Sequence, residues 1–291
     1  GSQTSILLKS GWEGTLLESG TIKLKRVKTF RPKRHTESAQ IEVFNNLFMS
    51  IAEQMGFVLE KTAQSITIKE RLDFSCAIFD KDGELVANAP HMPVHLGSMD
   101  STVKSIIKNN STLSPGDIFA INAPYNGGTH LPDITIVNPI WNSEKSEIIF
   151  YTAARGHHTD IGGLTPGSMP CNSTDIHEEG IYIDNWKIVY DGVFREQEIK
   201  NKLLSGSYPA RSPLTNIADL KAQIAACKKG ETELLKIVDK YGLETVFRFQ
   251  ELVCQNAENA VRDSIKTIKG TEIIYQMDND LSGAVRKIKI K

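Results

Sequence analysis

Two short segments rich in histidine and aspartate carry the residues best suited to chemistry. In residues 127–133 a glycine-rich stretch leads to His130 and Asp133, which are three apart around a proline that stiffens the turn. A second segment begins with His157 and His158, directly after a predicted strand. One of these two histidines would complete a set of two imidazoles and one carboxylate. Zn, Mn and Fe all accept that set, and it leaves coordination positions open for water or substrate.

Three further side chains are candidates for proton transfer or for orienting the metal ligands: Asp73, His95 and His158. Asp73 ends a run of alternating charges that includes Arg71, which could anchor a substrate. On the residues alone, an exposed ion-pair patch is the favoured interpretation of that run. His95 follows His91 by four residues, but Pro93 between them argues against a helix. We therefore expect a loop that places His95 in the same cleft as His157.

The composition excludes several classes of protein. With 34 basic and 35 acidic residues among 291, the formal net charge is −1, which argues against nucleic-acid and membrane-surface partners. No apolar run reaches the roughly 18 residues of a membrane span. The nucleotide-binding patterns GxxxxGK(S/T) and GxGxxG are missing, although Gly127 and Gly128 could form a backbone nest for an anion. Four widely spaced cysteines without a CxxC pair are expected to be reduced thiols in a cytoplasmic protein.

Hydrophobic periodicity predicts an α+β fold. We expect a mixed β core with a loop-borne metal site, followed by a C-terminal helical hairpin and preceded by a small N-terminal β segment. Residues 4–25 are predicted to form that segment, as a small meander, and residues 26–35 a basic linker. Helices are expected at residues 36–56, 99–108, 214–228, 231–241 and 243–269, with breaks at Gly230 and Gly242, and strands at residues 66–86, 117–122, 134–137, 148–154 and 284–290.

Six longer motifs, taken in order, resemble the hydantoinase B/5-oxoprolinase family. They are residues 70–77 (ERLDFSCA), 93–99 (PVHLGSM), 128–133 (GTHLPD), 155–163 (RGHHTDIGG), 165–170 (TPGSMP) and 219–226 (DLKAQIAA). The resemblance makes residues 35–291 the N-terminal portion of the family's B-type part. Residues 1–34 resemble the closing β segment of the ATP-using A-type part, together with a linker. N-methylhydantoinase B subunits and, more distantly, acetone carboxylase large subunits belong to the same family.

The resemblance implies an ATP-dependent hydrolase that opens a cyclic amide, either 5-oxoproline to glutamate or a hydantoin ring. The A-type part, an ATPase domain or subunit, would phosphorylate the substrate carbonyl oxygen, and the B-type part would complete the reaction within a homo- or hetero-oligomer. By the same resemblance His130, Asp133 and His157 would hold a divalent metal (Mn, Zn or Fe). His158 is the alternative to His157, and the resemblance leaves Asp73, His95 and His158 as candidates for proton transfer.

Two alternatives stay open at this stage. The chain could belong to an ATP-dependent ketone carboxylase, which would show bicarbonate-dependent activity with a ketone and would require partner chains. It could also be a non-catalytic assembly module, with a structural histidine cluster and a helical docking surface. Because the resemblance assigns the ATPase and the rest of the B-type part to other segments, we expect the chain not to turn over by itself.

Overall fold

The computed structural model describes residue 8 and residues 11–27, 36–268, 270, 272–279 and 285–290. Contacts between residues divide the chain into two units, Gly1–Gln40 and Ile41–Lys291. In the first unit β1 (Trp12–Leu16) and β2 (Ile22–Arg26) form an antiparallel hairpin, which is the small N-terminal β segment expected. Most of the predicted linker, residues 28–35, lies outside the described residues.

A seven-stranded antiparallel sheet forms the centre of the second unit, with the strand order β4-β3-β7-β6-β5-β8-β9. The α+β fold class is thereby confirmed. Asp82 and Gly83 form the turn between β3 and β4, as the sequence predicts. The strands are β3 (Phe74–Asp80), β4 (Leu85–Asn88), β5 (Ile118–Ile121), β6 (Asp133–Trp141), β7 (Ile148–His157), β8 (Trp186–Tyr190) and β9 (Val193–Phe194). The sequence pattern does not predict β8 and β9, which are short and lie at one edge.

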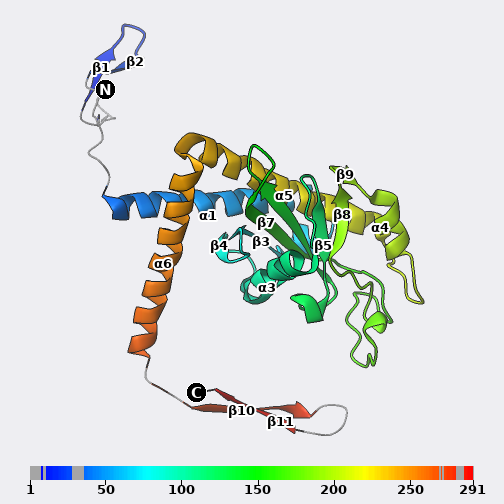
Figure 1. Cartoon of the computed structure of the whole chain (residues 1–291). Helices are drawn as coiled ribbons and strands as arrows, with labels where there is room; N and C mark the ends of the chain where they lie inside the picture. The colour runs from blue at the N-terminus through cyan, green and yellow to red at the C-terminus, as the bar shows by residue number, and fades with distance from the viewer. Residues whose placement is uncertain are drawn as a thin grey trace. The chain divides into compact units, whose positions relative to one another are not determined.

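Helices cover both faces of this sheet, as Figure 1 shows. On one face Phe48 and Leu220 of two long helices share an apolar cluster with Ile78 of β3. On the other face Met99 packs in a second cluster with Phe79, the next residue of the same strand. Because helices cover both faces, the residues of the central strands are buried at nearly every position. The covering helices are α1 (Glu37–Thr62) and α5 (Pro213–Tyr241) on the first face and α3 (Pro93–Asn109) on the second.

Two predicted element boundaries, one at residue 66 and one at residue 99, are wrong. Residues 66–69 form a short helix, α2 (Ile66–Lys69), instead of the start of a strand. α3 begins at Pro93, six residues before the predicted start. The expectation that Pro93 excludes a helix is wrong, because a proline at the first helical position lacks only an N–H that would have no intrahelical partner. His95 therefore lies in the first turn of a helix and not in a loop.

α5 runs without interruption to Tyr241, so the predicted break at Gly230 is wrong. Gly230 instead allows a close approach between elements. A Cβ atom there would lie 2.5 Å from Sδ of Met55 on α1 and 2.8 Å from Cγ2 of Thr152 on β7. The predicted break at Gly242 is present, with a φ of 81°, and Figure 1 shows α6 turning away from α5 at this point.

The remaining elements follow the sheet or connect its strands. The C-terminal helices are confirmed, and the last predicted strand is present as one half of an antiparallel pair. None of the helices in the described part of the chain is both long and apolar enough to cross a membrane. The elements are the 3-10 turns η1 (Pro124–Asn126) and η2 (Ile176–Glu178), α4 (Glu196–Leu203), α6 (Leu243–Thr267), β10 (Ile273–Asn279) and β11 (Val285–Ile290).

Two glycine-to-alanine substitutions in helices should change stability in opposite directions. Gly230→Ala should lower the free energy of unfolding by about 1–3 kcal/mol, because Thr152 on a central strand cannot move away from the new methyl group. Gly97→Ala in α3 should raise it by about 0.5–1 kcal/mol, because a Cβ there meets nothing within 4 Å. Urea unfolding of both variants measures the difference, and equal effects would contradict the packing role of Gly230.

Candidate metal centre

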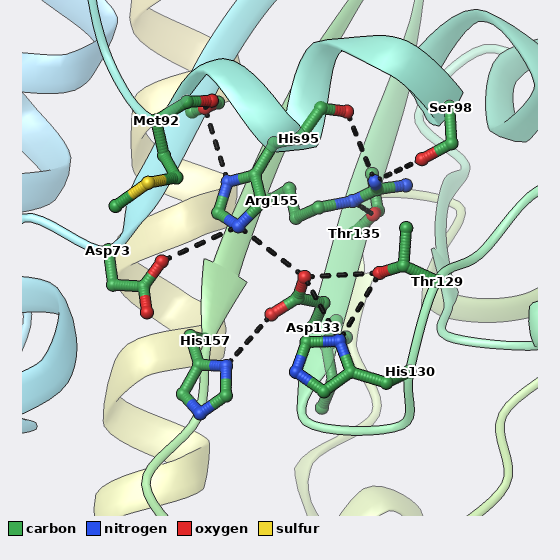
Figure 2. Close-up of polar contacts among 12 residues, drawn as sticks. Asp73, Met92, His95, Ser98, Thr129, His130, Asp133, Thr135, Arg155 and His157 are labelled. Atoms are coloured by element: carbon green, nitrogen blue, oxygen red, sulfur yellow. Dashed lines mark hydrogen bonds and ion pairs between the residues drawn. The ribbon is translucent and has the colours of Figure 1, made fainter. Parts of the chain in front are cut away.

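The register of two central strands brings Asp133 and His157 together. Asp133 is the first residue of β6 and His157 the last residue of β7, and the two are directly paired across the strands. Their side chains meet, with Nδ1 of His157 3.0 Å from Oδ1 of Asp133. The loop before β6 adds His130, whose Nδ1 lies 3.3 Å from Oδ2 of Asp133. The rings of His130 and His157 have centroids 5.1 Å apart, and Figure 2 shows both rings beside the carboxylate.

Two glycines let the loop before β6 pass close to α3. A Cβ atom on Gly127 would lie 2.5 Å from the backbone of Ser101 and Thr102, and one on Gly128 would lie 2.6 Å from the carbonyl oxygen of Ala123. The N–H of Gly128 already donates to that same oxygen, at 2.8 Å. This donor is therefore not available for the anion-binding nest that the sequence suggests. The glycines instead allow the loop that carries His130 to pack closely against α3.

His95 and Asp73 complete the cluster on its other side. Nε2 of His95 lies 3.4 Å from Oδ2 of Asp133 and 3.5 Å from Oδ1 of Asp73. Nδ1 of His95 lies 3.2 Å from the hydroxyl of Ser75, which itself donates to the carbonyl of Met92. Because the Ser75 hydroxyl donates to Met92, it can accept a hydrogen bond from Nδ1 of His95. Asp73 directly precedes β3, and its carbonyl accepts the N–H of His157 at 3.0 Å.

The cluster is graded from a buried side to an open one. The side chains of Asp133 and His95 are each 3% exposed, whereas those of His157, Asp73 and His130 are 16%, 28% and 37% exposed. The carboxylate and the central imidazole therefore lie in the protein interior. The outer two imidazoles and Asp73 remain accessible to water or to a ligand.

Hydrogen bonds dominate the electrostatics of Asp133. Burial alone would raise the pKa of Asp133, but hydrogen bonds from His130, His157 and His95 outweigh it and hold the pKa far below its usual range. The hydrogen bond to Asp133 in turn raises the pKa of His130, against the opposing effect of burial. The carboxylate is therefore ionised and is surrounded by imidazole nitrogens.

Arg155 lies on β7 between this cluster and α3, and its side chain is wholly buried. Its Nε donates to the hydroxyl of Thr135 at 2.7 Å. Its terminal nitrogens donate to the carbonyl of His95 at 3.2 Å, to the hydroxyl of Ser98 at 2.6 Å and to that of Thr102 at 2.8 Å. Burial lowers the pKa of Arg155 to about 10, so the guanidinium is still charged at neutral pH. Figure 2 shows how it ties the first turn of α3 to the sheet.

His158 lies apart from the others. Its side chain is fully buried, with Nε2 3.0 Å from Oε1 of Gln223 and Nδ1 3.3 Å from Nδ2 of Asn216, both on α5. Burial lowers the pKa of His158. Its contacts favour a role in docking α5 against the sheet, and they offer no ring nitrogen for proton transfer at the cluster.

The donor set fits a divalent metal. One ligand atom from each of His130, Asp133 and His157 lies within 4.8 Å of those of the other two. Two imidazoles and one carboxylate suit Zn, Mn or Fe and leave positions open on the exposed side.

Sequence reasoning missed two residues of the site, Arg155 and Thr129. The hydroxyl of Thr129 donates to Oδ2 of Asp133 at 3.1 Å. The signal for Arg155 was a charged residue directly after an apolar strand pattern.

Replacing Arg155 by lysine should destabilise the chain even though the charge is kept. A lysine cannot reach Thr135, Ser98 and Thr102 together, so we expect the free energy of unfolding to fall by about 2–4 kcal/mol. Arg262→Lys on the exposed face of α6 is the matched control and should change it by less than about 0.5 kcal/mol. Denaturant unfolding of both variants measures the two changes in the free energy of unfolding. If Arg155→Lys is as stable as the parent chain, only the charge at this position matters.

Comparison with known proteins places the chain in a family. The family model for hydantoinase B/oxoprolinase matches residues 37–291. The chain is 47% identical over 241 residues to 5-oxoprolinase 1 of Arabidopsis thaliana, covering 79% of this chain and 19% of that protein. It is 43% identical over 281 residues to the 5-oxoprolinase of Dictyostelium discoideum, covering 96% of this chain and 21% of that protein. The chain thus spans about a fifth of the length of these curated relatives.

Two solved structures share the fold. The ATP-dependent caprolactamase from Pseudomonas jessenii superposes with a TM-score of 0.76 at 24% identity, over 89% of this chain and 45% of that one. A nucleotide-free structure of acetone carboxylase gives a TM-score of 0.74 at 18% identity, over 88% of this chain and 35% of that one. The family match and the relatives above 40% identity lead to one conclusion: the chain belongs to the hydantoinase B/oxoprolinase family.

Proposed function

We propose that this chain is part of an ATP-dependent hydrolase that opens 5-oxoproline to glutamate. The observation that carries the proposal is the convergence of His130, Asp133 and His157 at an accessible sheet edge, in a chain 43–47% identical to proteins named 5-oxoprolinase. A hydantoin would be the related substrate, because it contains the same kind of ring C–N bond. The fold likeness to a caprolactamase is in keeping with a cyclic amide.

We assign the divalent metal to His130, Asp133 and His157. A metal bound there would polarise a substrate carbonyl and lower the pKa of a bound water. The residues around it would handle protons. Asp73 is accessible and lies 3.5 Å from His95, so it can accept a proton from water or substrate. His95, held between two carboxylates, would stabilise the negative charge of Asp73 and keep its oxygen aimed at the cluster.

ATP chemistry belongs, in this proposal, to an A-type ATPase domain or subunit. That part would phosphorylate the carbonyl oxygen of the cyclic amide, and the present chain would receive the activated substrate. The complete enzyme would then be a homo- or hetero-oligomer in the cytoplasm, where ATP is available. This proposal is supported by the observation that the chain covers only about a fifth of the length of its curated relatives.

Removing a proposed ligand should strongly weaken metal binding. His130→Ala and His157→Ala should each weaken Zn or Mn binding by more than about 100-fold, because losing a group that only orients a ligand already costs about 10–100-fold. His177→Ala, an exposed histidine outside the cluster, is the control and should bind as the parent chain does. Competition with a chromophoric chelator, together with elemental analysis, gives the affinities. Unchanged metal binding in both ligand variants would contradict the assignment of His130 and His157 as ligands.

Activity should require the rest of the enzyme. The chain alone, given metal, ATP and 5-oxoproline, should release no glutamate, whereas the complete enzyme that contains it should. In the complete enzyme, Asp73→Asn should lower kcat by about 10²–10⁴-fold, because a general base is lost. Asp239→Asn, on the exposed side of α5, should leave kcat unchanged. Bicarbonate-dependent use of a ketone would favour a carboxylase, and a metal-free, inactive assembly would favour a structural module.

A further inference from the structure

The hydrogen-bond ladder between β3 and β7 has an irregular last rung, at the end that reaches the metal centre. Phe74 pairs with Gly156, and the next facing residues are Asp73 and His157. The N–H of His157 donates to the carbonyl oxygen of Asp73 at 3.0 Å. In a regular antiparallel pair, the N–H of Asp73 would return a hydrogen bond to the carbonyl oxygen of His157. It instead donates to the carbonyl oxygen of Thr67, on α2, at 3.0 Å.

Thr67 supplies both contacts that the last rung lacks. Its hydroxyl donates to the carbonyl oxygen of His157 at 2.6 Å, and its own carbonyl oxygen accepts the N–H of Asp73. The hydroxyls of Ser65 and Thr159 lie 3.2 Å and 3.0 Å from the hydroxyl oxygen of Thr67. A carbonyl oxygen can only accept, so the hydroxyl hydrogen of Thr67 goes to His157. Thr67 is buried, so removing its hydroxyl would take this donor away from His157 without ready replacement by water.

Two local features hold α2 at this rung. The first is Gly156, where a Cβ atom would lie only 2.8 Å from Cδ1 of Ile68, so the glycine lets α2 lie against β7. The second is Leu72, which follows α2 with a φ of 56°, a left-handed conformation that residues with a Cβ rarely adopt. This turn directs the N–H of Asp73 back to Thr67. Backbone strain of this kind persists where the surrounding structure imposes it, and it is frequent at functional sites.

We propose that Thr67 is a positioning residue that sets the placement of Asp73 relative to His157. The inference rests on the proposed function, in which His157 binds the metal and Asp73 accepts a proton. Thr67 contacts the backbone of both residues, so it orients their side chains without taking part in the chemistry. A group that only orients a metal ligand still affects metal affinity, and small displacements of a base lower the rate.

Metal binding by the 291-residue chain gives the first test. Thr67→Val removes the hydroxyl and keeps the shape of the side chain, and it should weaken Zn or Mn binding by about 10–100-fold. Thr67→Ser keeps the hydroxyl and should bind the metal as the parent chain does. Thr232→Val is the matched control, because the hydroxyl of Thr232 also donates to a backbone carbonyl, at 2.9 Å, but on the exposed side of α5. It should leave the affinity unchanged in the same chelator competition.

Kinetics of the complete enzyme separate positioning from a purely structural role. At saturating metal, Thr67→Val should lower kcat by about 10–100-fold and leave KM unchanged, because only the alignment of the base is lost. Thr67→Ser should restore kcat. The proposal is overturned if Thr67→Val lowers only Tm and keeps the metal affinity and kcat of the parent.

Hydrogen exchange of the parent chain needs no variant and no metal, so it decides even if Thr67→Val fails to fold. The amide hydrogens of Asp73 and His157 should both exchange at least tenfold more slowly than in an unstructured peptide, because each is held in a hydrogen bond at this rung. Exchange of the Asp73 amide at the unprotected rate would overturn the role of Thr67. A parent chain that shows this protection but binds no metal would contradict the proposed function and leave the contacts of Thr67 supported.

Discussion

The buried carboxylate of Asp133 is the interaction around which the rest of the structure is arranged. An isolated carboxylate in a protein interior would cost several kcal/mol in lost solvation. Hydrogen bonds from His95, His130 and His157 offset that cost, and each histidine comes from a different segment. The antiparallel pairing of β6 with β7 places Asp133 and His157 side by side at one end of these strands. Neutralising Asp133 chemically would therefore loosen a helix, a loop and a strand end together.

Arg155 extends this polar layer along the face of the sheet that α3 covers. It lies on the strand that ends at His157, and it holds the first turn of α3 through the carbonyl of His95. Among the described residues no carboxylate contacts the guanidinium, so hydroxyl and carbonyl oxygens satisfy it while the charge of Asp133 acts at longer range. The opposite charges of Asp133 and Arg155 reduce the cost of burying either one.

Much of the candidate site could be predicted because its residues are tied to local pattern. The spacing of His130 and Asp133, and the position of His157 after an apolar run, follow from the chain itself. Where prediction failed, either tertiary packing outweighed local preference, as at Gly230, or proline was at a helix position that tolerates it, as at Pro93. Gly230 is a helix breaker by propensity, but close contact with Met55 and Thr152 keeps it inside a helix. Pro93 begins the helix it was expected to exclude, so His95 lies in the first turn of α3.

The sequence by itself determined the fold class, the family and the candidate metal ligands, because periodicity and motifs are properties of neighbouring residues. Only the tertiary structure decided which of two adjacent histidines joins the cluster. In a strand, successive side chains point to opposite sides, so His157 reaches Asp133 while His158 is buried against Gln223.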